Sequence, residues 1–349
     1  MIKFKAAILE KLNNPLIIEE LIVPDLDFGQ VLVKLSKSGI CGAQINEMTG
    51  VKGEDRYLPH LMGHEGSGIV IEVGLGVRNV KIGDHVVLHW RKGVGIDSLP
   101  PKYLSTSGKQ IGGGWVTTFN EYSVVSENRL TSIDKDIPFE IAALMGCAVT
   151  TALGLINNEA KLKIGQSVAI VGCGGVGLNL IQGATLVSAN PIVAIDIIDS
   201  KLELAKDFGA THTINLSEVN FDESITKIFG KSGVDVFIDT SGKSKNIVSA
   251  YRNTSSNGKT IMVGQPHIDD DLIFNKMVQN FTGKILMDSQ GGLTNPTIDI
   301  PRYLNLYKTG KLLLDKLISH RYRLEEVNLA INTIKKGEAI RCIIDLETT

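Results

Sequence analysis

Three short segments of this sequence place a cysteine or a histidine among glycines. Cys41 lies in SGICGAQ, His64 and Glu65 lie in GHEGSG, and Cys147 lies in LMGCAVTT. Cysteine sulfur and histidine nitrogen are zinc ligands, and three protein ligands leave open the fourth position that a catalytic zinc needs for its substrate. Each residue has another reading, because a lone cysteine is usually a small buried side chain and a lone histidine a satisfied polar group. Separation along the chain does not decide between the two.

A second candidate site is the turn VGCGGVG at residues 171–177. Its glycines have the spacing G-x-G-x-x-G, directly after an apolar segment and at the start of a predicted helix. Glycines allow the backbone to approach a pyrophosphate, and the helix N-terminus supplies unpaired N–H groups. The residues that we expect to contact a dinucleotide here are Gly172, Gly174, Gly175, Val176 and Gly177.

Asp196 follows the next predicted strand and completes this pattern. A carboxylate at this position accepts hydrogen bonds from ribose hydroxyls and repels a 2′-phosphate, which favours NAD over NADP. A structural turn with a coincidental aspartate remains an alternative, as does a site for S-adenosylmethionine. We interpret Cys173, inside the turn, as a small residue and not as a reactive thiol.

The segments that carry these residues predict two kinds of fold. Up to about residue 140, short apolar strands are separated by turns, and they are predicted at 31–35, 67–73 and 84–88. From about residue 150, strands alternate with helices, and the strands are predicted at 168–171, 192–195, 234–238 and 260–263. This alternation indicates right-handed βαβ units and a parallel sheet.

Further elements follow from local signals. The helix after the glycine turn should extend towards Val187, and Ser200 with Glu203 has the pattern of a capping box for the next helix. Apolar residues at 327, 330, 331 and 334 predict a helix that ends at Gly337, followed by a last strand at 340–346. Two prolines at 100–101 and the glycines at 112–114 indicate a long surface excursion.

Composition narrows the function classes. The chain has 349 residues, 43% of them hydrophobic, and a formal net charge of -2, with no block of like charge. Such a chain is long enough for two domains and offers no basic surface for nucleic acid or an anionic membrane. The four scattered cysteines do not form a disulfide framework, and the N-terminus has no signal-peptide pattern, so we expect a cytoplasmic protein.

Together, the motifs resemble those of the zinc-dependent medium-chain alcohol dehydrogenases along nearly the whole chain. The segment GICGAQ resembles the loop of the first metal ligand, GHEGSG the histidine–glutamate motif, and LMGCAVTTALG the segment of the second cysteine ligand. The glycine turn and Asp196 follow at the separation along the chain that the family pattern has. In addition, Lys201 resembles a lysine that binds the adenosine ribose, and Arg341 in GEAIRCII resembles an arginine that contacts the pyrophosphate.

The resemblance implies an α/β fold with two domains. A GroES-like, mostly β catalytic domain would comprise residues 1–148 and 290–349, and a doubly wound Rossmann domain that binds NAD would comprise 149–289. One catalytic zinc per chain would be held by Cys41, His64 and Cys147, with Glu65 beside the metal as a transient ligand. We expect reversible hydride transfer between NAD(H) and an alcohol, aldehyde or ketone, in a homodimer or homotetramer.

Three departures from the family pattern bear on this expectation. The stretch 89–119 contains no cysteine, so a second, structural zinc site is not predicted there. The first-ligand motif has Ala43 and Gln44 where members usually have a hydroxyl and an aspartate, and Asn46 replaces a proton-relaying histidine of some members. These changes leave the route of the alcohol proton open. A zinc-free quinone-type reductase and a non-catalytic NAD-binding protein are the alternative functions.

Overall fold

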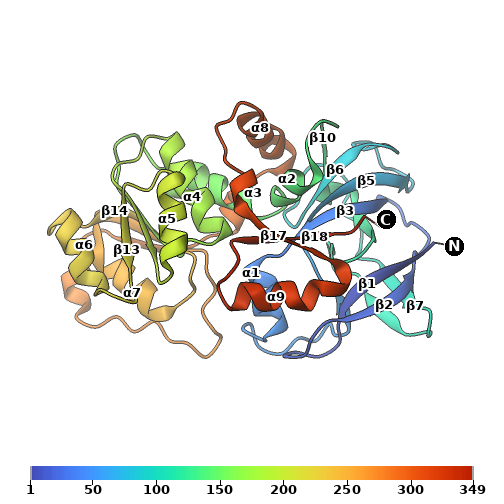
Figure 1. Ribbon diagram of the computed structural model, residues 1–349, viewed down its shortest axis with the longest axis horizontal. Helices are drawn as coiled ribbons and strands as arrows, with labels where there is room; N and C mark the ends of the chain where they lie inside the picture. The colour runs from blue at the N-terminus through green and yellow to red at the C-terminus, as the bar shows by residue number, and fades with distance from the viewer. Residues whose placement is uncertain (1, 348–349) are drawn as a thin grey trace. The chain divides into compact units, whose positions relative to one another are not determined.

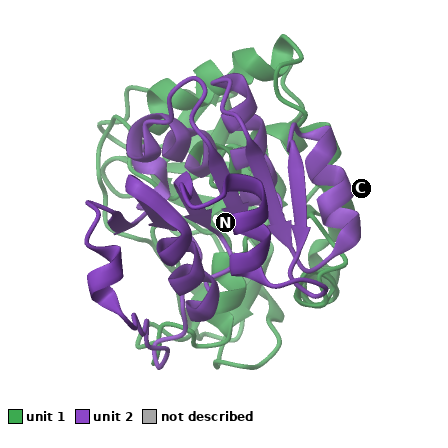
Figure 2. Cartoon of the chain, turned by 90° about the vertical axis from the view of Figure 1, so that its left-hand side faces the viewer, with its two compact units in different colours: residues 1–150, 295–349 green, residues 151–294 purple. Residues whose placement is uncertain are grey.

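The computed structural model describes residues 2–347, which form two compact units. One unit comprises residues 1–150 and 295–349, and the other comprises residues 151–294, as Figure 2 shows by colour. The first unit therefore combines segments from both ends of the chain. Within residues 2–347, no helix is both long enough and apolar enough to cross a membrane.

The first unit is built on two β-sheets (Figure 1). Its strands are β1 (Lys3–Leu9), β2 (Ile17–Ile22), β3 (Gln30–Gly39), β4 (His60–Leu61), β5 (Glu65–Val73), β6 (His85–His89), β7 (Lys102–Ser105), β8 (Gln110–Gly112), β9 (Tyr122–Ser126), β10 (Leu130–Ile133), β17 (Ile318–Arg323) and β18 (Arg341–Asp345). A closed barrel has the order β1-β2-β7-β8-β4. The larger sheet has the order β10-β6-β5-β3-β18-β17, with β9 beside β3.

Short helices connect and cover these strands. They are α1 (Gly42–Met48), α2 (Phe139–Leu144), α8 (Pro296–Lys308), α9 (Val327–Lys335), and the 3₁₀ helices η1 (Glu127–Arg129), η5 (Asp315–Leu317) and η6 (Leu324–Glu326). Helix α9 buries Val327, Ala330 and Ile331 in the core of this unit, which confirms the apolar face predicted from the sequence. The predicted last strand corresponds to β18.

The stretch around residues 100–115 is not the simple surface excursion that its prolines and glycines suggested. It contains β7 and β8, which pair with each other and close the barrel. Alternate side chains of β7 face inward, and Tyr103 is 1% exposed within the barrel core. The prediction failed because strands this short are hidden by the turn residues on either side of them.

The second unit contains a six-stranded parallel sheet with helices between the strands (Figure 1). The strands are β11 (Val168–Val171), β12 (Ile192–Asp196), β13 (His212–Asn215), β14 (Val234–Asp239), β15 (Thr254–Met262) and β16 (Ile285–Asp288). The helical segments are α4 (Gly175–Leu186), α5 (Asp199–Asp207), α6 (Phe221–Phe229), α7 (Ser244–Asn253), the π-helix η2 (Leu155–Ala160), and the 3₁₀ helices η3 (Met277–Asn280) and η4 (Gly291–Leu293). Helix α3 (Ala148–Gly154) spans the boundary between the units.

The strand order of this sheet is β13-β12-β11-β14-β15-β16, the order of a Rossmann fold. The predicted α/β fold with a Rossmann sheet is therefore confirmed. One local prediction was wrong: α5 begins at Asp199 after Ile198, so Ser200 lies inside the helix and does not cap it. The first N–H groups there turn instead to the Asp196 carboxylate, which accepts from Ile198 at 3.1 Å.

Candidate metal centre and cofactor turn

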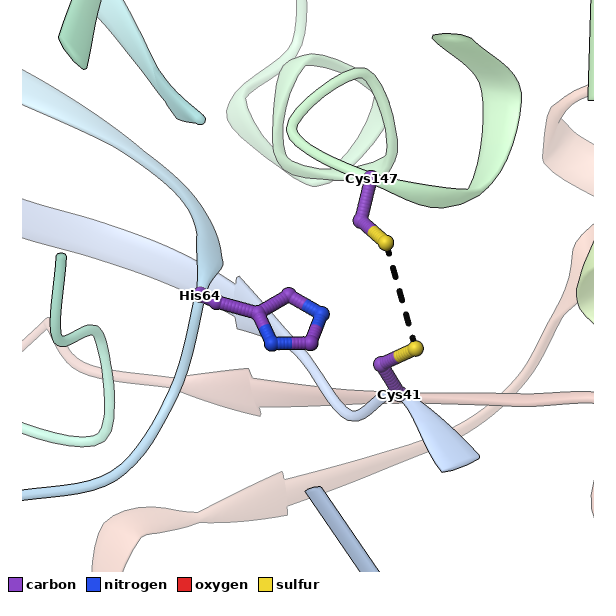
Figure 3. A group of neighbouring side chains, drawn as sticks. All are labelled: Cys41, His64 and Cys147. Atoms are coloured by element: carbon purple, nitrogen blue, oxygen red, sulfur yellow. Dashed lines mark hydrogen bonds between the residues drawn. The ribbon is translucent and has the colours of Figure 1, made fainter. Parts of the chain in front are cut away.

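Cys41, His64 and Cys147 come from three segments of the first unit. Cys41 lies between β3 and α1, His64 directly precedes β5, and Cys147 lies between α2 and α3. Their ligand atoms all lie within 4.8 Å of one another, and the two sulfur atoms are 3.9 Å apart (Figure 3). Two sulfurs bound to one tetrahedral zinc at about 2.3 Å are separated by roughly 3.8 Å. The spacing of these side chains therefore fits a zinc ion.

Strand pairing brings the three segments together. Strands β3 and β5 are antiparallel, with Ser38 opposite Gly66, so the loop that follows β3 lies beside the segment that precedes β5. Gly146 allows the third segment to lie against them, since a Cβ at this position would be 2.7 Å from the Cα of Glu65. A larger residue at 146 would push Cys147 away from the other two ligands.

The electrostatics of the three side chains also favour a cation. A hydrogen bond with Cys147 and the charge of His64 hold the pKa of Cys41 well below its usual value, despite burial. The same hydrogen bond, together with burial, raises the pKa of Cys147 well above its usual value. The two sulfurs lie 3.9 Å apart beside a buried His64 Nε2, which has no hydrogen-bond partner within residues 2–347, so the set of ligand atoms is incomplete. A bound metal ion would complete it.

Glu65 lies outside this group of ligand atoms. Its side chain is fully buried, and Arg341 Nη2 is 2.8 Å from one carboxylate oxygen and 2.9 Å from the other. The Ala148 N–H donates to the same carboxylate at 3.2 Å, and Arg341 also donates to the Ile40 carbonyl at 2.7 Å. Burial raises the pKa of Glu65, and the guanidinium opposes this shift. The pair thus links the ligand segments to β18.

Gln44 joins two of the ligand loops through their backbones. With its amide oxygen turned towards the histidine loop, it accepts from the N–H groups of Gly63 and His64, the latter at 3.1 Å. This contact involves the main chain of His64 and leaves its imidazole ring untouched by Gln44. Ala43 and Asn46 lie on α1 and are half-buried.

In the second unit, the glycine turn follows β11 and begins α4 at Gly175. A Cβ on Gly177 would overlap the Gly172 carbonyl, so this position has no room for any side chain. Gly174 is different, because a Cβ there would meet nothing within 4 Å. Space above Gly174, next to the first N–H groups of a helix, is what a phosphate group requires.

The structure places Asp196 directly at this turn. Its carboxylate accepts hydrogen bonds from the N–H groups of Cys173 at 2.6 Å, Ile197 at 2.7 Å and Ile198 at 3.1 Å. The sulfur of Cys173 is fully buried, and burial raises the pKa of this thiol far above its usual range. Lys201 lies on α5 and is half-buried. Arg341 belongs to the first unit, where it contacts Glu65.

A second group of possible metal ligands was missed by the sequence analysis. It consists of Glu47, Asp55 and His60. His60 Nδ1 lies 2.8 Å from the Leu61 carbonyl, and Nε2 lies 2.9 Å from Asp55 Oδ2 and 3.9 Å from Glu47 Oε1. An imidazolium between two carboxylates satisfies these contacts. No motif spacing indicates this group, because its members meet only when the loop before β4 folds back on α1.

Several aromatic and histidine side chains can now be assigned. Phe119 is fully buried in the core of the first unit. His89 is 1% exposed and is 2.9 Å from the Thr131 hydroxyl and 2.7 Å from the Arg91 carbonyl, and burial lowers its pKa to about 4. Both residues therefore pack in the interior of the first unit. Trp90 and Trp115 remain partly exposed.

Comparisons with known proteins agree on the type of chain. The family described as "Alcohol dehydrogenase GroES-like domain" matches residues 27–135, and the family described as "Zinc-binding dehydrogenase" matches residues 175–306. Alcohol dehydrogenase 1 of Pisum sativum is 31% identical, over 99% of this chain and 98% of its own length.

Solved structures show the same similarity in three dimensions. A protein from Burkholderia ambifaria described as an alcohol dehydrogenase zinc-binding domain protein has a TM-score of 0.90 at 26% identity, covering 99% of this chain and 100% of its own. Benzyl alcohol dehydrogenase from Acinetobacter calcoaceticus has a TM-score of 0.89, also at 26% identity, with the same coverage of both chains.

Proposed function

The chain belongs to the zinc-dependent alcohol dehydrogenase family, and from this we propose that Cys41, His64 and Cys147 hold its one catalytic zinc. The protein is an oxidoreductase that interconverts an alcohol and a carbonyl compound with NAD(H). The observation that carries the assignment of the site is the group of three ligand atoms within 4.8 Å, one of them the unpartnered His64 Nε2. A zinc-free quinone-type reductase would have no use for such a group.

In this proposal, each residue of the site has its own role. Zinc supplies a Lewis acid that polarises the substrate oxygen, and NAD(H) accepts or donates the hydride. Cys41 and Cys147 neutralise the charge of the ion, and Gln44 fixes the loops that carry Cys41 and His64. Arg341 holds Glu65 beside the ligand segments, from where we propose that Glu65 enters the ligand set transiently.

We assign NAD binding to the second unit, with the first unit as the catalytic one. Gly172, Gly174, Gly175, Val176 and Gly177 would approach the pyrophosphate. Asp196 has carboxylate lone pairs left for ribose hydroxyls, since each oxygen of a carboxylate accepts more than one hydrogen bond. Lys201 would contact the ribose, and Arg341 the pyrophosphate. NAD is preferred over NADP because Asp196 repels a 2′-phosphate.

The proton of the alcohol needs a route that avoids Ala43. We propose an ordered water held by the amide of Gln44 or Asn46, or by the cofactor ribose. Gln44 already bonds to backbone N–H groups, which favours Asn46. We also propose that the protein is cytoplasmic and forms a homodimer or homotetramer.

The test is a screen of alcohols with NAD and of aldehydes and ketones with NADH, in which turnover is monitored by NADH absorbance. We expect turnover with NAD, little with NADP, loss of activity on chelation, and recovery with Zn²⁺. Asp196→Ser should weaken the binding of NAD and reduce the preference for NAD over NADP in turnover. Faster turnover with NADP would contradict the role of Asp196, and the absence of any turnover in metal-loaded protein would favour the non-catalytic alternative.

A further inference from the structure

Trp90 leaves the larger sheet beside the candidate metal ligands. Strands β5 and β6 are antiparallel, with Glu65 opposite His89. The next residues outward along this ladder are His64 and Trp90, so the segment after β6 begins next to a metal ligand. The Thr118 hydroxyl donates to the Glu65 carbonyl at 3.3 Å, so the segment that carries Trp115 also leads to this place.

Three cations surround these two indoles. The Arg129 guanidinium lies 5.6 Å from the centre of the Trp115 ring, and the Lys92 ammonium lies 6.0 Å from it. The Arg91 guanidinium lies 5.7 Å from the centre of the Trp90 ring. Arg129 Nη1 also donates a hydrogen bond to the Trp90 carbonyl, so Arg129 contacts both tryptophan segments. We call these five residues the tryptophan–arginine cluster.

Of the three cations in the cluster, only Arg129 is buried. Lys92 is paired with Asp97 at 2.6 Å, and Asp97 also accepts from the Asn128 amide at 3.1 Å. Arg129 is only 5% exposed, and within residues 2–347 no carboxylate forms an ion pair with it. Its Nε–H has no hydrogen-bond partner, and burial lowers its pKa. A buried guanidinium with an unused donor is costly unless a ligand compensates it.

We propose that the tryptophan–arginine cluster is a subsite for an anionic group, a carboxylate or a phosphate, on the alcohol or carbonyl substrate. Arg129 supplies the fork of N–H donors that recognises either group, and the indoles supply flat walls for the adjacent carbon chain. Trp115 is 48% exposed, so a ligand can reach the ring that covers Arg129. The inference rests on the proposed function for its substrate class, but the binding of the anion can be measured without turnover.

Tryptophan fluorescence offers that measurement, because the chain has 2 tryptophans and both belong to the cluster. Zinc-loaded protein without NAD is titrated with 4-hydroxybutyrate and with glycerol 3-phosphate, and with the neutral partners 1,4-butanediol and glycerol. We expect a saturable change in emission for one or both anions at concentrations at least tenfold below those needed for their neutral partners. The two pairs distinguish a carboxylate from a phosphate.

Arg129→Gln is the decisive variant, with Arg252→Gln as its control. Arg252 is an exposed arginine of the second unit that pairs with Asp222 at 3.0 Å, outside both sites. We expect Arg129→Gln to remove the anion response and to reduce the anion-to-neutral ratio of kcat/KM to about threefold or less, mainly through KM. Arg129→Lys, which retains the charge without the fork, should have an intermediate ratio and serves if the glutamine variant does not fold.

Three outcomes separate the possibilities. Equal responses to anionic and neutral ligands in the unmodified protein, or an anion response that survives in Arg129→Gln, would overturn the subsite. Turnover of neutral alcohols without anion preference would leave the proposed function intact and remove only this inference. A saturable anion response that depends on Arg129, in a protein that oxidises no alcohol, would support the subsite and contradict the proposed function.

Discussion

The candidate metal centre and the glycine turn differ in how far the chain satisfies its own polar groups. At the metal centre, the buried His64 Nε2 has no hydrogen-bond partner within residues 2–347, and the sulfurs of Cys41 and Cys147 lie 3.9 Å apart. At the glycine turn, the backbone already donates three hydrogen bonds to Asp196. We therefore expect the first site to need an ion to satisfy its ligand atoms, whereas the polar groups of the second are already paired within the chain.

This difference indicates which kind of substitution should damage each site. We expect the loss of a metal ligand to abolish function with little loss of packing, because the surrounding strands are held by their own hydrophobic core. Adding a Cβ at Gly177 of the glycine turn disturbs packing, because it would overlap the Gly172 carbonyl. Substitutions at the two sites test this distinction.

Cys147→Ala should abolish zinc binding and lower activity by about a thousandfold or more, since Lewis-acid stabilisation contributes several kcal/mol. Cys342→Ala is the matched control, because Cys342 is a fully buried thiol outside the ligand group and should retain zinc and activity. Metal analysis should find one zinc in the unmodified chain and still one in His60→Gln. Two tightly bound zincs, one of them lost in His60→Gln, would instead make the Glu47–Asp55–His60 group a second metal site.

Gly177→Ala should lower the free energy of unfolding by about 2 kcal/mol or more, because the new Cβ overlaps the Gly172 carbonyl and the backbone must shift. Gly174→Ala is the control from the same turn, and its stability should change by less than about 1 kcal/mol because the site has space. Urea unfolding measures both. Gly174→Ala should nevertheless weaken NAD binding if the phosphate occupies that space; equal stability losses in the two variants would refute the distinction.

Glu127 in the first unit, like Asp196 in the second, is a carboxylate that accepts hydrogen bonds from three backbone N–H groups. Its contribution to the stability of the fold should depend on pH. Its carboxylate accepts backbone N–H groups of Arg78, Asn79 and Ile96, and these bonds lower its pKa below 4.5 although burial opposes them. A lowered folded pKa means that the unfolded state binds more protons, so this stability is complete above pH 4.5 and is lost as the pH falls through the folded value.

Glu127→Gln should accordingly cost about 2 kcal/mol at pH 7. The cost should shrink as the pH is lowered below 4.5, where the unmodified chain itself becomes protonated. Denaturant unfolding of both proteins at several pH values measures the difference. A cost that stays constant with pH would show that the hydrogen bonds do not depend on the charge of the carboxylate.

Ala43→Ser should have the smallest effect. It restores a hydroxyl near the proposed proton route, and the rate and its pH dependence should change by less than the hundredfold that is typical of a general acid–base residue. Ala43→Val, which fills the position without a hydroxyl, separates proton transfer from packing. A gain of several hundredfold would indicate that the native loop is catalytically impaired, and would favour the non-catalytic alternative.

The parts of the molecule that were predictable from the sequence are those whose signals are local. Strand β11 and helix α4 follow from an apolar run and a glycine pattern that adjoin each other, so no distant residue can override them. The metal ligands are 23 and 83 residues apart along the chain, and only the family resemblance, not spacing, brought them together. The false capping box at Ser200 shows a limit even of local signals, since Asp196 supplied the acceptor instead.

Arg129 illustrates what the sequence alone could not show. Nothing in VSENRL marks this arginine, because its role depends on two tryptophans, 39 and 14 residues earlier. The pairing of β6 with β10 brings the first of them, Trp90, next to Arg129. That no carboxylate within residues 2–347 forms an ion pair with Arg129 is likewise a property of three-dimensional packing. Tertiary contacts of this kind leave no periodic pattern in the chain.

The ion pair between Glu65 and Arg341 joins residues that are 276 positions apart. At about 5–20 residues per second, a ribosome needs roughly 15–55 s to add the intervening chain. Until then, Glu65 lacks its guanidinium partner and β3 lacks β18 as a neighbour, and the second unit, residues 151–294, is synthesised within this interval. The second unit can therefore complete its sheet during translation before β18 joins the sheet of the first unit.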